Sequence, residues 1–119
     1  MKSEFKKIAI ICASERELAP FLPLIENPTI SERAMLRIHE GRLNGFEVAA
    51  VYCGVCKVNA AAAAQIMIDC YGADTVISAG ASGGMAEELQ LFDTVVAAEA
   101  CYHDVHERIC LLQIQICHQ

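Results

Sequence analysis

Short runs of apolar residues are the feature that most constrains the fold of this chain. Lys7-Ile-Ala-Ile-Ile-Cys12 is nearly continuously apolar, and Asp74-Thr-Val-Ile-Ser-Ala79 is a second run of this kind. Strands buried on both faces have such sequences, and they occur in parallel or mixed sheets that are covered by helices. The two runs therefore predict buried strands of an α/β domain.

A helix start signal follows the first apolar run. Ser14-Glu-Arg-Glu17 has the form of a capping box, with Ser14 as the N-cap and Glu17 at the third helical position. This pattern predicts a helix that ends near residue 26, kinked or split by Pro20 and Pro23, with Asn27-Pro28 closing the segment.

The remaining elements complete an α/β order. Asn44-Gly45 is a strong hairpin signal between two strand-like runs, Ala34–Glu40 and Phe46–Cys53. The alanine-rich stretch Lys57–Cys70 predicts the clearest helix, and Thr94–Ala98 predicts a further strand. The order strand, helix, hairpin, helix, strand, loop, strand predicts a mixed, twisted sheet flanked by helices.

Composition excludes several classes of protein. The 119 residues suffice for one domain, and 55% of them are hydrophobic. The net charge of -6 is not concentrated in any run, which argues against a nucleic-acid or anionic-membrane partner. No apolar span is long enough to cross a membrane, and the apolar stretch at residues 8–13 is too short for a signal peptide. A cytoplasmic location is expected.

The seven cysteines are expected to be mainly buried free thiols, because their number is odd and no signal peptide precedes them. Cys53-Gly-Val-Cys56 leaves a thiol–disulfide function open as an alternative, since it precedes a predicted helix and resembles the active-site segment of thioredoxins. Against that family, Tyr52 stands in place of its tryptophan and no proline follows Pro28. Cys101, His103, His106 and Cys110 match no common structural zinc site, so neither a metal nor a cofactor is expected.

Two features are candidates for chemistry. Glu17 comes just after the carboxyl end of the first strand, where open α/β sheets assemble their sites, and its carboxylate could orient or deprotonate a water molecule there. The plainer interpretation is that Glu17 only caps the helix. Gly80-Ala-Ser-Gly-Gly84 follows a buried strand, so its backbone amides could contact a sugar or a base edge, although a simple tight turn also explains it.

Five segments in register resemble one family, the 5'-methylthioadenosine/S-adenosylhomocysteine nucleosidases of the nucleoside phosphorylase superfamily. The resemblance covers about the first 104 residues. Its segments are Lys7–Glu17, Gly41–Gly45, Cys53–Ala60, Ile77–Gly84 and Tyr102–Asp104.

The resemblance implies hydrolysis of the N-glycosidic bond of a small adenine thionucleoside, with release of adenine. It assigns Glu17 to activation of the attacking water and Val55 to the neighbourhood of the ribose and alkylthio group. Four further positions line the ribose and purine in the family: Ala13, Ser14, Ser82 and Gly83. Related phosphorylases bind phosphate through a glycine and an arginine after the first strand. The carboxylate of Glu17 favours a hydrolase here, while Arg16 leaves phosphorolysis open.

The sequence also departs from the family. The family's enzymes are roughly twice as long, and their second half supplies the aspartate that protonates adenine and the groups that hold the ribose and stack on the base. We therefore predict that residues 1–104 are the N-terminal part of a nucleosidase-like domain and that residues 105–119 are a divergent tail. A non-catalytic remnant that binds a nucleoside or self-associates is the main alternative, and a homodimer is left open.

Overall fold

The computed structural model describes residues 6–102. The chain divides into two compact units, Met1–Ser82 and Gly83–Gln119, which are considered separately. Within the described residues, all helices and strands belong to the first unit.

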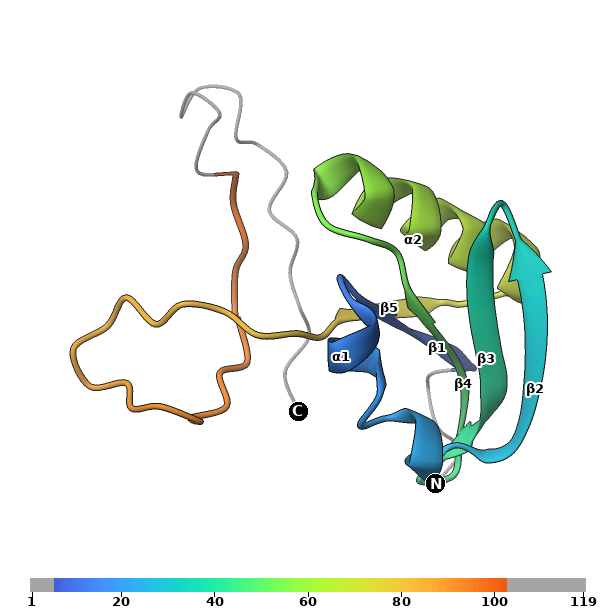
Figure 1. The fold of residues 1–119 in the computed structure, drawn as a ribbon, viewed down its shortest axis with the longest axis horizontal. Helices are drawn as coiled ribbons and strands as arrows, with labels where there is room; N and C mark the ends of the chain where they lie inside the picture. The colour runs from blue at the N-terminus through green and yellow to red at the C-terminus, as the bar shows by residue number, and fades with distance from the viewer. Residues whose placement is uncertain (1–5, 103–119) are drawn as a thin grey trace. The chain divides into compact units, whose positions relative to one another are not determined.

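The first unit is built on a five-stranded mixed sheet with the order β2-β3-β4-β1-β5 (Figure 1). Strand β1 runs parallel to both β4 and β5, whereas β2, β3 and β4 form an antiparallel meander. This architecture confirms the predicted mixed α/β sheet. The strands are β1 (Lys7–Cys12), β2 (Glu26–Arg33), β3 (Leu36–Leu43), β4 (Phe46–Tyr52) and β5 (Thr75–Ser78).

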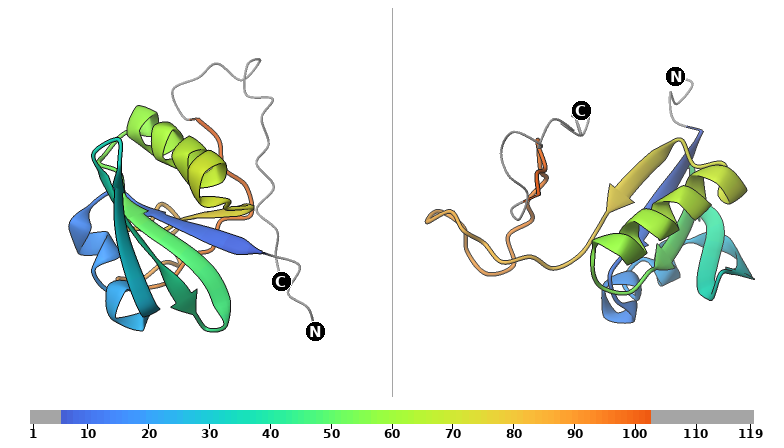
Figure 2. Two further views of the ribbon diagram at one scale, coloured as in Figure 1. Left: turned by 90° about the vertical axis from the view of Figure 1, so that its right-hand side faces the viewer. Right: turned by 90° about the horizontal axis from the view of Figure 1, so that it is seen from above.

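Different helices cover the two faces of this sheet (Figure 2). Helix α2 (Lys57–Tyr71) packs on one face through Ala63 and Met67. Helix α1 (Glu15–Leu18) and the short 3₁₀ helix η1 (Leu22–Leu24) cover the other face. Side chains of β1 and β4 alternate between the two cores: Ala9, Ile11, Ala49 and Val51 pack with α2, whereas Ile10, Cys12, Val48 and Ala50 pack with α1 and η1.

The hairpin and the long helix confirm the local signals. Asn44 and Gly45 both have positive φ, at 50° and 86°, in the turn between β3 and β4. Helix α2 ends at Tyr71 and is capped by Gly72, which takes the left-handed conformation at φ 70°. The turn before β3 also has positive φ at Ala34 and Met35, so β3 begins at Leu36 rather than at Ala34 as predicted.

The segment after the capping box differs from the prediction. Helix α1 has only four residues: Ala19 caps its C-terminus and is followed directly by Pro20, which has no backbone N–H to continue the helix, and Pro23 lies in the separate helix η1. Asn27 and Pro28 do not close the segment but lie within β2, which the sequence analysis missed. Strand β2 is an edge strand with mostly exposed residues, so it lacks the apolar pattern by which strands are recognised.

Two further strand predictions need correction. Strand β5 forms, but it lies at the edge of the described sheet, and Val76 and Ile77 are 41% and 46% exposed rather than buried. No strand forms at Thr94–Ala98 among the described residues of the second unit. Val95 and Val96 there are 64% and 70% exposed, and a strand sequence without a pairing neighbour does not make a stable strand.

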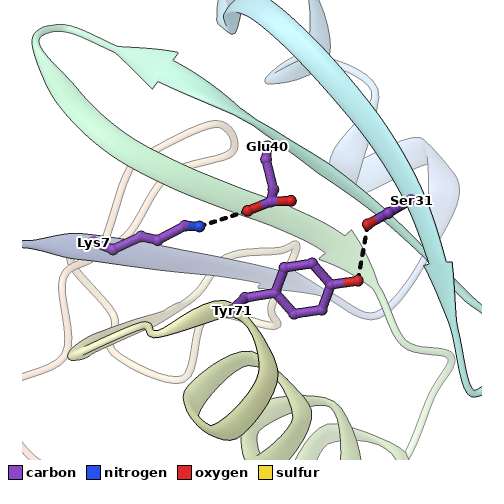
Figure 3. A network of polar contacts seen from close by, with 4 residues as sticks. All are labelled: Lys7, Ser31, Glu40 and Tyr71. Atoms are coloured by element: carbon purple, nitrogen blue, oxygen red, sulfur yellow. Dashed lines mark hydrogen bonds and ion pairs between the residues drawn. The ribbon is translucent and has the colours of Figure 1, made fainter.

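Polar contacts join the C-terminal end of α2 to the meander (Figure 3). The Lys7 ammonium forms an ion pair of 2.5 Å with Glu40. The hydroxyl groups of Ser31 and Tyr71 lie 2.8 Å apart in a hydrogen bond. The hydrogen bond ties α2 to β2, and the ion pair joins β1 to β3.

The cysteines are less buried than predicted. The five that the structure describes are free thiols, as expected, but only Cys12 among them is buried. Cys53 is half-buried, and Cys56, Cys70 and Cys101 are exposed. Although these three cysteines have apolar neighbours in the sequence, they do not lie in a core.

Candidate active site

The carboxyl ends of β4, β1 and β5 meet at one edge of the sheet, because these neighbouring strands are parallel. Beyond the strand ends, the N–H of Cys53 donates to the carbonyl of Cys12 at 2.9 Å, and the N–H of Ala79 donates to the carbonyl of Ile11 at 3.0 Å. The three segments that follow the strands therefore start side by side. Sites in open α/β folds are commonly built from such segments.

Glu17 belongs to the segment that follows β1, and its carboxylate reaches the segment that follows β5. Its Oε2 accepts hydrogen bonds from the backbone N–H groups of Ala13 and Ser14, both at 3.0 Å, and from the Ser14 hydroxyl at 3.2 Å. The N–H of Glu17 donates to Ser14 Oγ at 3.4 Å, which completes the predicted capping box. Its Oε1 accepts from the N–H of Ala81 at 2.9 Å, so the carboxylate does more than cap its own helix.

These donors favour the ionised form of Glu17 and so lower its pKa. The Ala81 N–H does most to lower the pKa of the carboxyl below its usual value, and the Ser14 and Ala13 donors lower it further, although partial burial acts in the opposite direction. A carboxylate oxygen has room for about two hydrogen bonds. Oε2 accepts from Ala13 and from both donors of Ser14, whereas Oε1 accepts only from Ala81 among these donors. Oε1 is therefore the oxygen that can also accept a hydrogen bond from a water molecule.

Gly80 makes room for this carboxylate. A Cβ atom at Gly80 would lie 2.7 Å from Oε1 of Glu17 and 3.0 Å from its Cδ. The absence of a side chain at Gly80 therefore allows the backbone of the glycine loop to approach Glu17, as expected for a glycine that lies against a functional group.

The two thiols near Glu17 are neutral. Burial, followed by the negative charge of Glu17 and the electrostatic interaction with Cys53, raises the pKa of Cys12 to about 11. Burial likewise raises the pKa of Cys53. A redox-active thiol needs the opposite shift, so the surroundings of Cys53 do not favour the thiol–disulfide alternative.

The segment after β4 carries the exposed side chain of Val55. Gly54 and Cys56, on either side of it, have positive φ values of 85° and 83°. Asn59, in the first turn of α2, donates from Nδ2 to the carbonyl of Val55 at 2.7 Å.

The predicted site residues divide between the two units. The first unit brings together Ala13, Ser14 and Glu17, and it carries Val55 at the same sheet edge. Ser82 is the last residue of the first unit and Gly83 the first of the second, so their roles remain predictions.

Sequence reasoning missed the contributions of Gly80, Ala81 and Asn59. The glycine loop indicated that backbone groups there could contact a ligand. The N–H of Ala81 could not be singled out, because a backbone donor is not marked by the type of its residue. The bond from Asn59 could have been suspected from its place near the start of a helix, where asparagine commonly bonds to neighbouring backbone groups.

Residues 6–102 contain no group of three or more metal-binding side chains, and His103, His106 and Cys110 lie outside this range. None of the helices in this part of the chain is long and apolar enough to span a membrane.

Comparison with known proteins supports the family. Residues 7–113 match the family profile described as Phosphorylase superfamily. The 5'-methylthioadenosine/S-adenosylhomocysteine nucleosidase of Shewanella sediminis is 37% identical over 99 residues, which cover 83% of this chain and 43% of that protein. The corresponding protein of Maridesulfovibrio salexigens is 36% identical over 98 residues, covering 82% of this chain and 42% of its own length.

Solved structures agree with these matches. The nucleosidase of Colwellia psychrerythraea 34H in complex with adenine matches with a TM-score of 0.83 at 36% identity, covering 89% of this chain and 44% of that one. The Neisseria meningitidis nucleosidase in complex with methylthio-immucillin-A matches with a TM-score of 0.81 at 33% identity, covering 87% of this chain and 45% of that one. The futalosine hydrolase of Helicobacter pylori matches with a TM-score of 0.78 at 26% identity, covering 87% of this chain and 45% of that one.

The chain spans less than half the length of these relatives. The resemblance to nucleosidases drawn from the sequence is nevertheless confirmed, and the profile match extends over most of the chain. The order of the sheet, the carboxylate after β1 and the match over residues 7–113 thus lead to one conclusion: this chain belongs to the phosphorylase superfamily.

Proposed function

We propose that this chain forms the water-activating part of a nucleosidase that hydrolyses the N-glycosidic bond of 5'-methylthioadenosine or S-adenosylhomocysteine. The observation that carries the proposal is the Glu17 carboxylate, which is held by Ala13, Ser14 and Ala81 at the carboxyl edge of the sheet. The names of the relatives supply the substrate class, and one related structure contains adenine.

Glu17 has two tasks in this mechanism. As adenine leaves, the sugar becomes oxocarbenium-like, and the fixed negative charge of Glu17 stabilises it. Oε1 accepts a proton from the water whose oxygen bonds to the anomeric carbon. The electrons of the broken carbon–nitrogen bond leave with adenine, which takes up a proton. The products are adenine and the free thio-sugar.

The lowered pKa of Glu17 suits the first task in particular. A carboxylate with a low pKa stays charged through the reaction but is a weaker proton acceptor. We therefore assign most of its effect to electrostatic stabilisation and to orientation of the water. Hydrolysis is preferred to phosphorolysis because a carboxylate at this position would repel phosphate.

The remaining site assignments belong to the same proposal. Val55 contacts the ribose and alkylthio group, and Ser82 and Gly83 line the purine and ribose. We place the reaction in methionine salvage in the cytoplasm. A homodimer would cover the exposed apolar side chains of α2, among them Val58 at 80% and Ile68 at 47% exposure.

The test is adenine release from 5'-methylthioadenosine by the purified 119-residue chain. Glu17→Gln keeps the size of the side chain but removes its charge, and Glu15→Gln is the matched control, since Glu15 is an exposed glutamate on the same helix. We expect Glu17→Gln to lower the rate by a factor on the order of a hundred to ten thousand, and Glu15→Gln to leave it unchanged.

Other outcomes separate the alternatives. Release that survives in Glu17→Gln would refute the assignment of Glu17. Release only in the presence of phosphate would indicate a phosphorylase. Nucleoside binding without release from a folded chain would indicate a non-catalytic binding protein, and sedimentation as a monomer would exclude the homodimer.

A further inference from the structure

Segment 53–56, which connects β4 to α2, has an unusual backbone. Gly54 and Cys56 both have positive φ, and Cys56, at φ 83° and ψ 159°, lies in a region that is adopted almost only by glycine. Val55 lies between them with 66% of its surface exposed. The unfavourable backbone conformation of Cys56, next to an exposed valine, needs contacts that hold the segment in place.

The segment is held at both of its ends. At the strand end, the N–H of Cys53 donates to the carbonyl of Cys12 at 2.9 Å, and its thiol donates to the carbonyl of Gly54 at 3.2 Å. At the helix end, the N–H of Ala60 donates to the carbonyl of Cys56 at 3.2 Å.

Asn59 holds the centre of the segment. Its Nδ2 donates to the carbonyl of Val55 at 2.7 Å. The same amide lies against Gly54, since a Cβ atom there would be 3.1 Å from Nδ2. Asn59 therefore bonds to the carbonyl of Val55 and occupies the space next to Gly54 that a side chain there would need.

We propose that Asn59 is a positioning residue for recognition of the 5'-alkylthio group, through its hold on Val55. The inference rests on the proposed function, which places Val55 next to that group. An apolar contact contributes more to binding when its backbone is already ordered, because less conformational entropy is lost on binding. Asn59 provides this order in the free protein, and it does so without touching the substrate.

The test compares two nucleosides that differ at the 5' position. Dissociation constants for 5'-methylthioadenosine and for adenosine, which carries a hydroxyl instead of the methylthio group, are measured by NMR titration. The variants are Asn59→Ala and Asn59→Asp, the second of which keeps the shape but loses the donor. Gln65→Ala is the matched control, because Gln65 on the same helix also donates from an exposed amide, at 2.8 Å to Asp69.

Both Asn59 variants should weaken binding of 5'-methylthioadenosine by about two- to tenfold and leave adenosine binding unchanged. Relaxation of the Gly54 and Val55 backbone amides in the free variants should report increased motion. Gln65→Ala should match the wild type in both measurements.

The remaining outcomes overturn the inference and show which proposal has failed. An equal loss for both nucleosides would mean that Asn59 supports the fold in general. Unchanged affinities in the Asn59 variants, with a wild type that binds 5'-methylthioadenosine, would refute the role of Asn59 alone. A folded wild type that binds neither nucleoside would refute the proposed function and this inference with it.

Discussion

The backbone N–H of Ala81 donates a hydrogen bond of 2.9 Å to Oε1 of Glu17, a residue 64 positions earlier in the chain. This bond joins the segment after β1 to the segment after β5. It is also the largest cause of the lowered pKa of Glu17. A backbone group from a distant part of the sequence therefore does most to lower the pKa of the candidate catalytic group.

Replacement of Gly80 by alanine should break this arrangement. The new Cβ would lie 2.7 Å from Oε1 of Glu17, so the carboxylate must move away from Ala81. We expect the pKa of Glu17 to rise toward its usual value of 4.5, as measured by NMR titration of the carboxyl carbon. Any adenine release should fall by about tenfold to a hundredfold, because small displacements of a catalytic group are costly.

Gly84→Ala is the control for this substitution. Its Cβ would come within 3.2 Å of the terminal carbon Cδ1 of Leu89, which can move aside. An unchanged titration of Glu17 in Gly80→Ala would contradict the tight approach of the two residues.

Asp74 should contribute to the acid sensitivity of the fold. Its carboxylate accepts from the N–H of Lys6 at 2.8 Å and from the N–H of Lys7 at 3.3 Å, and these bonds lower its pKa below 3.8. A group whose pKa is lower in the folded state contributes stability above its unfolded pKa. That contribution is lost as the pH falls from 3.8 through the lower pKa of the folded state.

Urea unfolding at about pH 5 and at about pH 2.5 measures this effect. Asp74→Asn should lower the free energy of unfolding at the higher pH and have less effect at the lower pH. The stability of the variant should therefore change less between the two pH values than that of the wild type. Asp69→Asn, on the exposed side of α2, serves as the comparison. Parallel pH profiles for Asp74→Asn and the wild type would disprove the contribution of Asp74.

Cys56→Gly should stabilise the protein. The backbone at Cys56 costs a non-glycine residue about 1–3 kcal/mol, and the greater freedom of glycine in the unfolded chain offsets part of the gain. We expect an increase of about 1 kcal/mol in the free energy of unfolding, measured in urea. Cys70→Gly, inside α2, should lower it by about 1 kcal/mol, because glycine is a poor helix former. A loss of stability in Cys56→Gly would show that the thiol makes a favourable contact.

The thiols should differ in their reactivity. Cys12 is buried, and its pKa of about 11 leaves almost no thiolate at neutral pH, whereas Cys56 and Cys70 are exposed. Iodoacetamide treatment of the native protein followed by mass spectrometry should therefore show alkylation of Cys56 and Cys70 well before Cys12. Equal rates in the native state would mean that the core around Cys12 opens readily.

Local sequence patterns determined much of this fold. The apolar run of β1, the Asn44-Gly45 turn, the alanine-rich helix α2 and the Ser14–Glu17 capping box were all predictable, because each depends on residues that are close in sequence. Glu17 was a candidate for the same reason, since it follows a buried strand.

Tertiary structure decided the rest. Strand β2 is polar and exists because β3 pairs with it, whereas the apolar segment Thr94–Ala98 forms no strand within the described residues. Pairing with a neighbour, rather than the intrinsic preference of a segment, separates these two cases. The bond from Ala81 to Glu17 likewise depends on β1 and β5 lying side by side. The sequence identified the carboxylate, and the folded sheet supplied the backbone donor that holds it in its charged form.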